Sequence, residues 1–446
     1  MRNKSYLVGV MMLCSACCFG QKAWTLRECI DYALEHNIQL KQNILQSESA
    51  DEDVKQSRAQ LLPSLSFQSG QTLNYRPFPE GGGYTVTNGY VDAKVKKVTY
   101  NGSYGINANW TIWNGNKNRN QVKQNELSAR QAELNAMETA NSIQEQITLL
   151  YVQILYNTEA VGVLRQVVEV SKQNLQRGKD MLTVGQIARA DVAQLEAQLA
   201  SDEYNLVNAQ GQVAQQKLQL KQLLEITDSS DFDIVVPKTS EEQALAAIPS
   251  VADTYANALT TRPEVKNAQL GIEASEVQMK IARAGHIPTI GLNASIGAST
   301  NSSSDNSWGQ QMKNNLNGGL GFNISVPIVD QRQTRTNIRK AKIDKESRQL
   351  ELQNVQKELW SKIEGYWLDA NTNQARLRSS MASASSAAES YNLVSEQFKE
   401  GLKNIQELTT GKTTLLNAEQ SRLESKYTAI YSLQMLKFIA GNEIEI

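Results

Sequence analysis

The sequence predicts an α+β membrane protein that consists of a duplicated unit of very long antiparallel helices and four membrane-crossing β-strands. Three observations support this prediction. Several long stretches alternate apolar and polar residues, as a strand with one apolar face does. Two stretches without proline are far longer than ordinary helices, and the order of helices and strands occurs twice along the chain.

The N-terminus has the order of residues that is typical of a secretory signal peptide. Arg2 and Lys4 precede the apolar residues 6–13, and small residues follow. We therefore expect residues 1–20 to be a signal peptide that is cleaved after Gly20.

A lipoprotein is the alternative for this end of the chain. Residues 15–17 resemble the end of a lipid-attachment box whose cysteine is Cys17, although Cys14 stands where that box has leucine. Cleavage after Gly20 would leave Cys29 as the single cysteine. Cys29 could then form no internal disulfide, and we expect it to act as a small apolar residue in the first helix.

Residues 24–62 follow a helical pattern, opened by Thr25 as a cap with Glu28 three residues on. Pro63 ends this pattern. A later segment rich in proline and glycine contains the run 81–83, but no Gly-Lys-Ser/Thr follows it. We therefore expect a surface loop there and no phosphate site.

The clearest strand covers residues 98–112, in which apolar and polar residues alternate. Its length satisfies the ~9 to 11 residues that a tilted strand needs to cross a bilayer. We predict that its apolar residues face lipid: Val98, Tyr100, Tyr104, Ile106, Trp110 and Ile112.

Three other stretches repeat the alternation, at 65–75, 290–298 and 316–328. Four strands cannot close a barrel, because the smallest membrane barrels have about eight strands and open sheet edges are not tolerated in hydrocarbon. The chain is therefore expected to share its barrel with copies of itself.

No proline occurs between residue 115 and Pro237, and apolar residues recur there mostly at steps of three, four or seven. The pattern predicts a helix over about 116–184, a turn at Gly185 and a returning helix over about 190–225. A polar linker and a short strand at 232–236 follow.

The chain then repeats itself. Residues 33–67 match residues 258–292 at a constant offset, with nine identities. The second strand and long helix realign at a slightly smaller offset, which places Gly185 over Gly401. We therefore divide the chain into a first repeat at 21–230, a linker or equatorial segment at 231–250 and a second repeat at 251–446.

The duplicated order of elements, together with the opening Ala33 and Leu34 and their echo Ala258 and Leu259, resembles the TolC-like outer-membrane efflux family. The resemblance covers the whole mature sequence. It implies a homotrimer in the cell outer membrane, in which each chain gives four strands to a twelve-stranded β-barrel. The helices would form an α-barrel tunnel in the periplasm.

The resemblance also implies partners and an activity. Periplasmic adaptor (membrane fusion) proteins would link the tunnel to an inner-membrane RND pump or ABC exporter. The chain would be a passive, porin-like conduit with efflux transmembrane transporter activity in a tripartite efflux or type I secretion system. Outer-membrane lipid would surround it, and no cofactor is implied.

The family's tunnel tapers at the turns after its long helices, and this implies where a gate lies. Carried across by position, seven residues would form the periplasmic aperture: Gly185, Asp191, Phe398, Gly401, Lys403, Glu407 and Thr410. Lys403 replaces an arginine, Phe398 a tyrosine, and Thr410 one aspartate of an acidic ring. Our hypothesis is that Lys403 ties to Asp191 across neighbouring helices.

Structural alternatives exist for these residues. Asp191 stands where a helix N-terminus favours a carboxylate, and Lys403 and Glu407 are four residues apart and could form a solvated pair.

The remaining chemistry argues against an enzyme. Two histidines, His36 and His286, have no metal-ligand spacing, and the sequence around Lys412 lacks the first glycine of a nucleotide loop. A net charge of -1 gives no reason to expect nucleic acid. After residue 20 we also expect no apolar run of the kind that forms a membrane-spanning helix.

Two other functions remain as alternatives. A periplasmic coiled-coil scaffold without channel activity would explain the helices but would leave the apolar strand faces uncovered. A cell-surface enzyme or adhesin would need functional residues in the loops at 81–83 or 301–308, which are poor in catalytic residue types.

Overall fold

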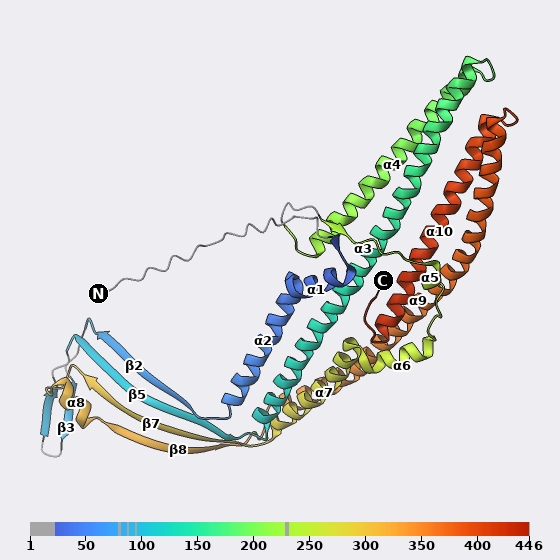
Figure 1. The fold of residues 1–446 in the computed structure, drawn as a ribbon. Coiled ribbons are helices and arrows are strands. Elements are labelled where there is room, and N and C mark those ends of the chain that lie inside the picture. Colours follow the sequence, from blue (N-terminus) through green and yellow to red (C-terminus); the bar gives the residue numbers. More distant parts are fainter. Residues whose placement is uncertain (1–22, 79–81, 87–88, 94–95, 228–231, 446) are drawn as a thin grey trace, which may run out of the picture. The chain divides into compact units, whose positions relative to one another are not determined.

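The computed structural model describes residues 23–78, 82–86, 89–93, 96–227 and 232–445 (Figure 1). The predicted signal peptide and Cys17 lie outside these residues. The chain divides into two compact units, and each combines segments from both halves of the sequence. Unit 1 comprises 1–41, 138–262 and 357–446, and unit 2 comprises 42–137 and 263–356.

The first helical segment is two helices, α1 (Leu26–His36) and α2 (Ile38–Ala59), and not the single helix expected over 24–62. The predicted capping box of Thr25 and Glu28 is present at the start of α1. Asn37 breaks the helix because its backbone leaves the helical region, with ψ 127°. Its buried side chain then accepts a hydrogen bond from Leu40 N at 3.0 Å, which caps the next turn.

The second repeat breaks at the matching position. Arg262 separates α6 (Val251–Thr261) from α7 (Pro263–Arg283), and its ψ of 129° is close to that of Asn37. Pro263 explains this break, because the residue before a proline is disfavoured in the helical region. A 3-10 turn (η1, Ala284–His286) follows α7.

The long helices confirm the predicted duplication. Helices α3 (Lys117–Thr183) and α9 (Gln333–Lys399) each have 67 residues. The returning helices α4 (Arg189–Leu223) and α10 (Ile405–Ile439) each have 35 residues. At ~1.5 Å per residue the longer pair extends on the order of 100 Å.

The turns between these helices are equivalent as well. Gly185 and Gly401 have φ of 75° and 74°, a region that glycine occupies without a side-chain penalty. We call these two turns the tips.

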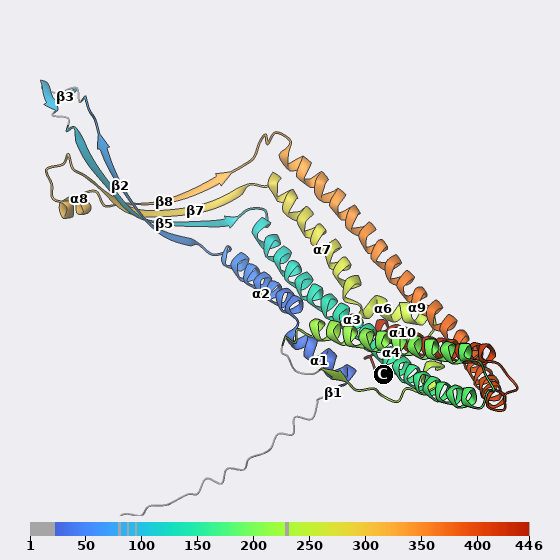
Figure 2. The same ribbon diagram turned by 90° about the horizontal axis from the view of Figure 1, so that it is seen from above.

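The four predicted strands form one antiparallel sheet in the order β2-β5-β7-β8 (Figures 1 and 2). They are β2 (Ser64–Tyr75), β5 (Val98–Trp113), β7 (Thr289–Asn301) and β8 (Asn317–Ser325). Strand β8 ends earlier than the predicted 316–328, just before Pro327, which has no N–H to donate to a ladder.

The connections hold further elements. Strands β3 (Gly82–Val86) and β4 (Gly89–Ala93) form a hairpin, so the expectation of a plain loop at 81–83 is wrong for Gly82 and Gly83. Tyrosine and β-branched residues in this segment favour a strand, and these outweigh the glycines. Helix α8 (Trp308–Asn314) lies between β7 and β8.

The linker between the repeats is also structured. Strand β6 (Asp233–Ile234) pairs in parallel with β1 (Ala23–Trp24), and helix α5 (Glu241–Ala244) follows. Tyr151 of α3 is almost fully buried and donates from its hydroxyl to the Val235 carbonyl at 2.7 Å. This bond fixes the linker onto the first long helix.

The core of unit 1 follows the apolar stripe predicted on α3, where Ile143, Ile147, Ile154, Leu164 and Val168 are buried. In one respect the sequence reading was wrong. An 18-residue window of α3 is apolar and uncharged enough to resemble a membrane-spanning helix, and half of it is buried in the fold, as in a core helix.

Candidate functional site

The four-stranded sheet carries its apolar side chains on one face. The strand register aligns them in rows, so each apolar residue has an apolar or small neighbour on the next strand. Three rows show this: Leu65, Ala108, Ala294 and Leu320; Phe67, Ile106, Ile296 and Gly318; Trp110, Leu292 and Phe322.

The opposite face of the sheet is polar or small in every intervening row. One such row runs Ser66, Asn107, Ser295 and Gly319. On the apolar face Leu65 and Leu320 are each 75% exposed and Phe67 is 68% exposed. An uncovered apolar surface of this extent is expected to meet either lipid or another protein.

Five of the residues predicted to face lipid belong to the apolar face: Val98, Tyr100, Tyr104, Ile106 and Trp110. The sixth, Ile112, lies at a β-bulge between Thr111 and Trp113 and has no partner on β7. The extra residue shifts the alternation, so Trp113 and not Ile112 stands opposite Ile290.

Beneath the tips, unit 1 has a buried apolar cluster. It contains Met181, Leu195, Tyr391, Phe398, Ile405 and Leu408. Phe398, one of the predicted aperture residues, is 1% exposed and therefore packs between helices. Thr410, another of them, is exposed.

Asp191 and Glu407 occupy equivalent positions after the two tips. Each is the third residue of its helix and accepts a hydrogen bond from the backbone at the N-cap: Ala188 N to Asp191 at 3.0 Å, and Asn404 N to Glu407 at 3.3 Å. These bonds satisfy amide groups that a helix start would otherwise leave without partners. Both carboxylates thus cap the N-termini of the returning helices, α4 and α10.

Lys403 lies beside Glu407, with Nζ 2.5 Å from Oε1. The Lys403 ammonium, and after it the Asn404 N–H, lower the pKa of the Glu407 carboxyl below its ordinary 4.5. This is the solvated pair that the sequence left as an alternative, although Lys403 precedes the N-cap Asn404 and therefore lies outside α10. A tie from Lys403 to Asp191 across neighbouring helices stays a prediction.

Sequence reasoning missed a buried ion pair below the tips. The side chains of Lys412 on α10 and Asp202 on α4 are 6% and 5% exposed and form a salt bridge. Lys412 also donates to Ser171 Oγ at 2.8 Å, and Ser171 donates to the same carboxylate at 2.6 Å. The network joins the α3–α4 hairpin to α10.

Lys412 is no part of a nucleotide loop, since it stands inside α10. A signal for its real role was present in the sequence. Lys412 falls on the buried stripe of α10, four residues after Leu408 and three before Leu415. A polar residue on an apolar stripe calls for a buried partner.

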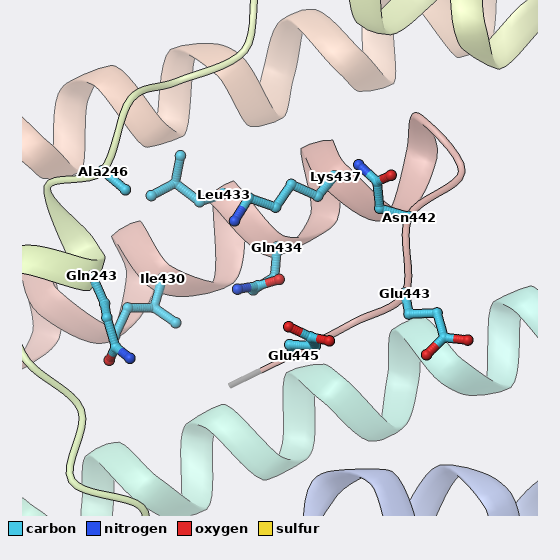
Figure 3. Close-up of a pocket in the computed structure, with 9 residues that line it drawn as sticks. All are labelled: Gln243, Ala246, Ile430, Leu433, Gln434, Lys437, Asn442, Glu443 and Glu445. Atoms are coloured by element: carbon cyan, nitrogen blue, oxygen red, sulfur yellow. The ribbon is translucent and has the colours of Figure 1, made fainter.

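The described residues form several cavities. One of about 680 Å³ lies beside the end of α10, where Gln434, Lys437, Glu443 and Glu445 contribute its polar groups (Figure 3). Across the residues that the structure describes, no group of three or more histidine, cysteine or acidic side chains is placed to hold a metal. Cys29 is buried, which raises the pKa of its thiol to about 12.

A sheet with one apolar and one polar face, attached to duplicated helices of 67 residues, defines the class of outer-membrane channels with a helical tunnel. The family model described as "Outer membrane efflux protein" matches residues 29–225 and 254–442. The chain belongs to this family. It is therefore an outer-membrane channel protein and not an enzyme.

Relatives that match this chain are named as outer membrane or secretion proteins. The chain is 22% identical to outer membrane protein TolC of Escherichia coli (strain K12), over 94% of this chain and 83% of that one. It is 23% identical to outer membrane efflux protein BepC of Brucella suis biovar 1 (strain 1330), over 82% and 77%. It is 21% identical to proteases secretion protein PrtF of Dickeya chrysanthemi, over 99% and 93%.

Solved structures share the fold. The outer membrane protein VceC of Vibrio cholerae has a TM-score of 0.76 at 17% identity, covering 94% of this chain and 97% of that chain. The open state of the MtrE outer membrane channel of Neisseria gonorrhoeae also has a TM-score of 0.76 at 17% identity, with coverage of 94% and 89%.

Proposed function

We propose that the chain is the outer-membrane channel of a tripartite efflux or type I secretion system. It acts as a passive trimeric conduit from the periplasm to the exterior and is gated at the periplasmic tips. The observation that carries the proposal is the four-stranded sheet, whose single apolar face suits lipid and whose opposite face suits a water-filled lumen.

The trimer is supported by the open edges of the sheet. Among the residues that the structure describes, strands β2 and β8 each have a neighbour on one side only. Unpaired backbone groups are not tolerated in hydrocarbon, so β8 of one copy pairs with β2 of the next. The open edges require more than one copy, and three copies, the number that the family resemblance implies, close a twelve-stranded barrel.

The relatives support the proposed partners, because the names of two of them refer to efflux and to protease secretion. A periplasmic adaptor (membrane fusion) protein joins the tips to an inner-membrane RND pump or ABC exporter. The pump supplies the energy and selects the cargo, and the channel supplies a path that keeps polar cargo out of lipid.

The gate is the finer part of the proposal. Gly185 and Gly401 set the turns, and Asp191, Lys403 and Glu407 place charges beside them. Around a three-fold axis each charge occurs three times, so polar ties between neighbouring chains can hold the tunnel shut. Phe398 supports the turn from the buried cluster, and Thr410 contributes an exposed hydroxyl.

The experiment is single-channel conductance of the detergent-purified oligomer in a planar bilayer. Discrete steps are expected, small at rest and larger in Lys403→Ala. Steps that are the same size in both proteins would contradict the gate and keep the channel.

The coiled-coil scaffold is separated from the channel by membrane extraction. A channel remains with the outer-membrane fraction after washing with sodium carbonate, whereas a scaffold is released. Release of the folded chain would contradict the proposed function.

A further inference from the structure

We propose that a cationic pocket at the start of α3 binds the phosphate group of a phospholipid in the periplasmic leaflet of the outer membrane. The pocket has a volume of about 460 Å³ and lies within unit 2, between the first turn of α3 and the end of α7. Arg119, Lys280 and Arg283 line it together with two asparagines, and none of its lining residues is acidic.

The three cations form no salt bridge with a carboxylate among the described residues. Arg283 donates to Met279 Sδ at 3.3 Å, a weak acceptor. The acidic residue four positions before Lys280, Glu276, pairs instead with Lys345 at 2.8 Å. The Lys345 ammonium, and more weakly that of Lys280, lower the pKa of the Glu276 carboxyl, so Glu276 compensates part of the Lys280 charge. Three positive charges therefore line one pocket without a salt bridge to a carboxylate among the described residues, an arrangement that favours a bound anion.

The internal duplication shows that the absence of these salt bridges distinguishes Lys280 and Arg283 from the equivalent residues of the first repeat. Lys280 and Arg283 correspond to Lys55 and Arg58 of the first repeat. Lys55 pairs with Glu52 at 2.7 Å, and Arg58 pairs with Glu126 at 2.5 Å. The residues that correspond to these two glutamates are Val277 and Lys342, so the second repeat keeps both cations and has lost both acidic partners.

The position of the pocket identifies the anion, and this step rests on the proposed membrane placement of the strands. Gly115 of the pocket follows the end of β5 by two residues, and Ile287 precedes the start of β7 by two. Trp110 and Trp113 lie near the same end of β5, where aromatic residues of barrels meet the membrane interface. Phospholipid phosphates lie at that level.

The chemistry of the lining suits such a group. The guanidinium groups of Arg119 and Arg283 can each present paired N–H donors to phosphate oxygens, and the Lys280 ammonium adds a point charge. Ile287 gives the pocket an apolar side next to the strands, where the glycerol and the first methylenes of a lipid would lie. The pocket adjoins the two central strands of the sheet, away from the edges that neighbouring chains use.

The test measures lipid binding to the membrane-extracted, delipidated oligomer. Phosphatidylglycerol is titrated against wild type and the R119Q/K280Q/R283Q variant, with the dissociation constant read by native mass spectrometry. The matched control is K55Q/R58Q/R335Q, which removes the same charges from the equivalent positions. We expect affinity to fall about tenfold or more in the pocket variant and to stay at the wild-type value in the control.

Inorganic phosphate separates the two sources of the anion. If millimolar inorganic phosphate displaces bound phosphatidylglycerol as effectively as added phosphatidylglycerol does, the assignment to lipid is wrong. Equal loss in both variants, or no loss in the pocket variant, would overturn the pocket itself. Should the triple variant fail to assemble, the single Lys280→Gln and Arg283→Gln variants carry the same comparison.

If the proposed membrane channel is wrong, the outcome differs from that of a wrong pocket. In that case the chain is recovered in the soluble fraction before any lipid is added. An oligomer extracted from membranes that binds lipid without using the pocket contradicts the pocket alone.

Discussion

At the scale of single residues, the buried pair of Lys412 and Asp202 decides how the helices below the tips are held together. Each charge is nearly inaccessible to water and depends on the other for compensation. We predict that Lys412→Met destabilises the oligomer by roughly 3 to 5 kcal/mol, because it leaves the Asp202 carboxylate buried and unpaired. Thermal unfolding followed by circular dichroism measures this.

Two further variants make that prediction specific. Lys412→Met combined with Asp202→Leu removes both charges and is expected to recover most of the loss. Lys399→Met removes an exposed charge near the same tip and is expected to leave the melting temperature unchanged. If the double variant is no more stable than the single one, the ion pair is not the cause.

The pair of Lys403 and Glu407 predicts a pH dependence of the gate. Because the folded-state pKa of Glu407 lies below its ordinary 4.5, the pair stabilises the closed tip above that value and is lost as the pH falls through the folded-state pKa. We expect the conductance to rise on acidification below about pH 4.5. Glu407→Gln should show high conductance at neutral pH and no further rise, whereas Lys399→Ala should behave as wild type.

At the scale of elements, the tip glycines determine where each long helix ends. An added side chain would touch nothing within 4 Å at Gly185 or Gly401, so the cost of alanine comes from the backbone alone. With φ near 75°, we predict that Gly185→Ala and Gly401→Ala each destabilise by roughly 1 to 2 kcal/mol.

The control for the tip glycines is Gly211→Ala. Gly211 lies inside α4 with open space around it, so alanine there should stabilise the helix by up to about 1 kcal/mol. Denaturant unfolding of the three variants tests whether the effects have opposite signs. Equal effects at Gly211 and Gly185 would contradict the assignment of the tip turns.

At the scale of the whole molecule, the two faces of the sheet predict opposite outcomes for one substitution. Ile296 belongs to the apolar face and Ser295 to the polar face of the same strand. We expect Ile296→Arg to prevent assembly in the membrane, at a cost of roughly 2 to 4 kcal/mol per chain near the bilayer midplane. Ser295→Arg should assemble and change the conductance.

Assembly is measured by the amount of oligomer extracted from the outer membrane and separated on a gel without heating. If both arginine variants assemble equally well, the apolar face of the sheet does not face lipid.

Much of this fold was predictable because its signals are local. The alternation of β5, the absence of proline in α3 and the glycine at each tip depend on neighbouring residues only. The break at Asn37 and the bulge at Ile112 were not predicted. Each depends on contacts that periodicity does not record: a side chain that caps the next turn, and a partner strand with one residue fewer.

In the candidate site, too, some features were predictable from local sequence and others were not. The positions of Asp191 and Glu407 at helix starts could be read from spacing, because capping uses residues three apart. The network of Lys412, Asp202 and Ser171 joins α10 to two helices that lie more than 200 residues earlier, so spacing alone could not find it. The burial of Phe398 likewise depends on Met181 and Leu195, more than 200 residues earlier in the chain.

The α3–α4 and α9–α10 hairpins have helices of equal length, and this limits which insertions and deletions the protein can tolerate during evolution. A residue inserted into α3 alone would move one tip by ~1.5 Å along its helix and rotate every later side chain by about 100° relative to the other repeat. A tolerated change of length has to occur in both halves and by whole heptads. We expect shorter insertions to be tolerated only in the connections, such as the one that carries β3 and β4.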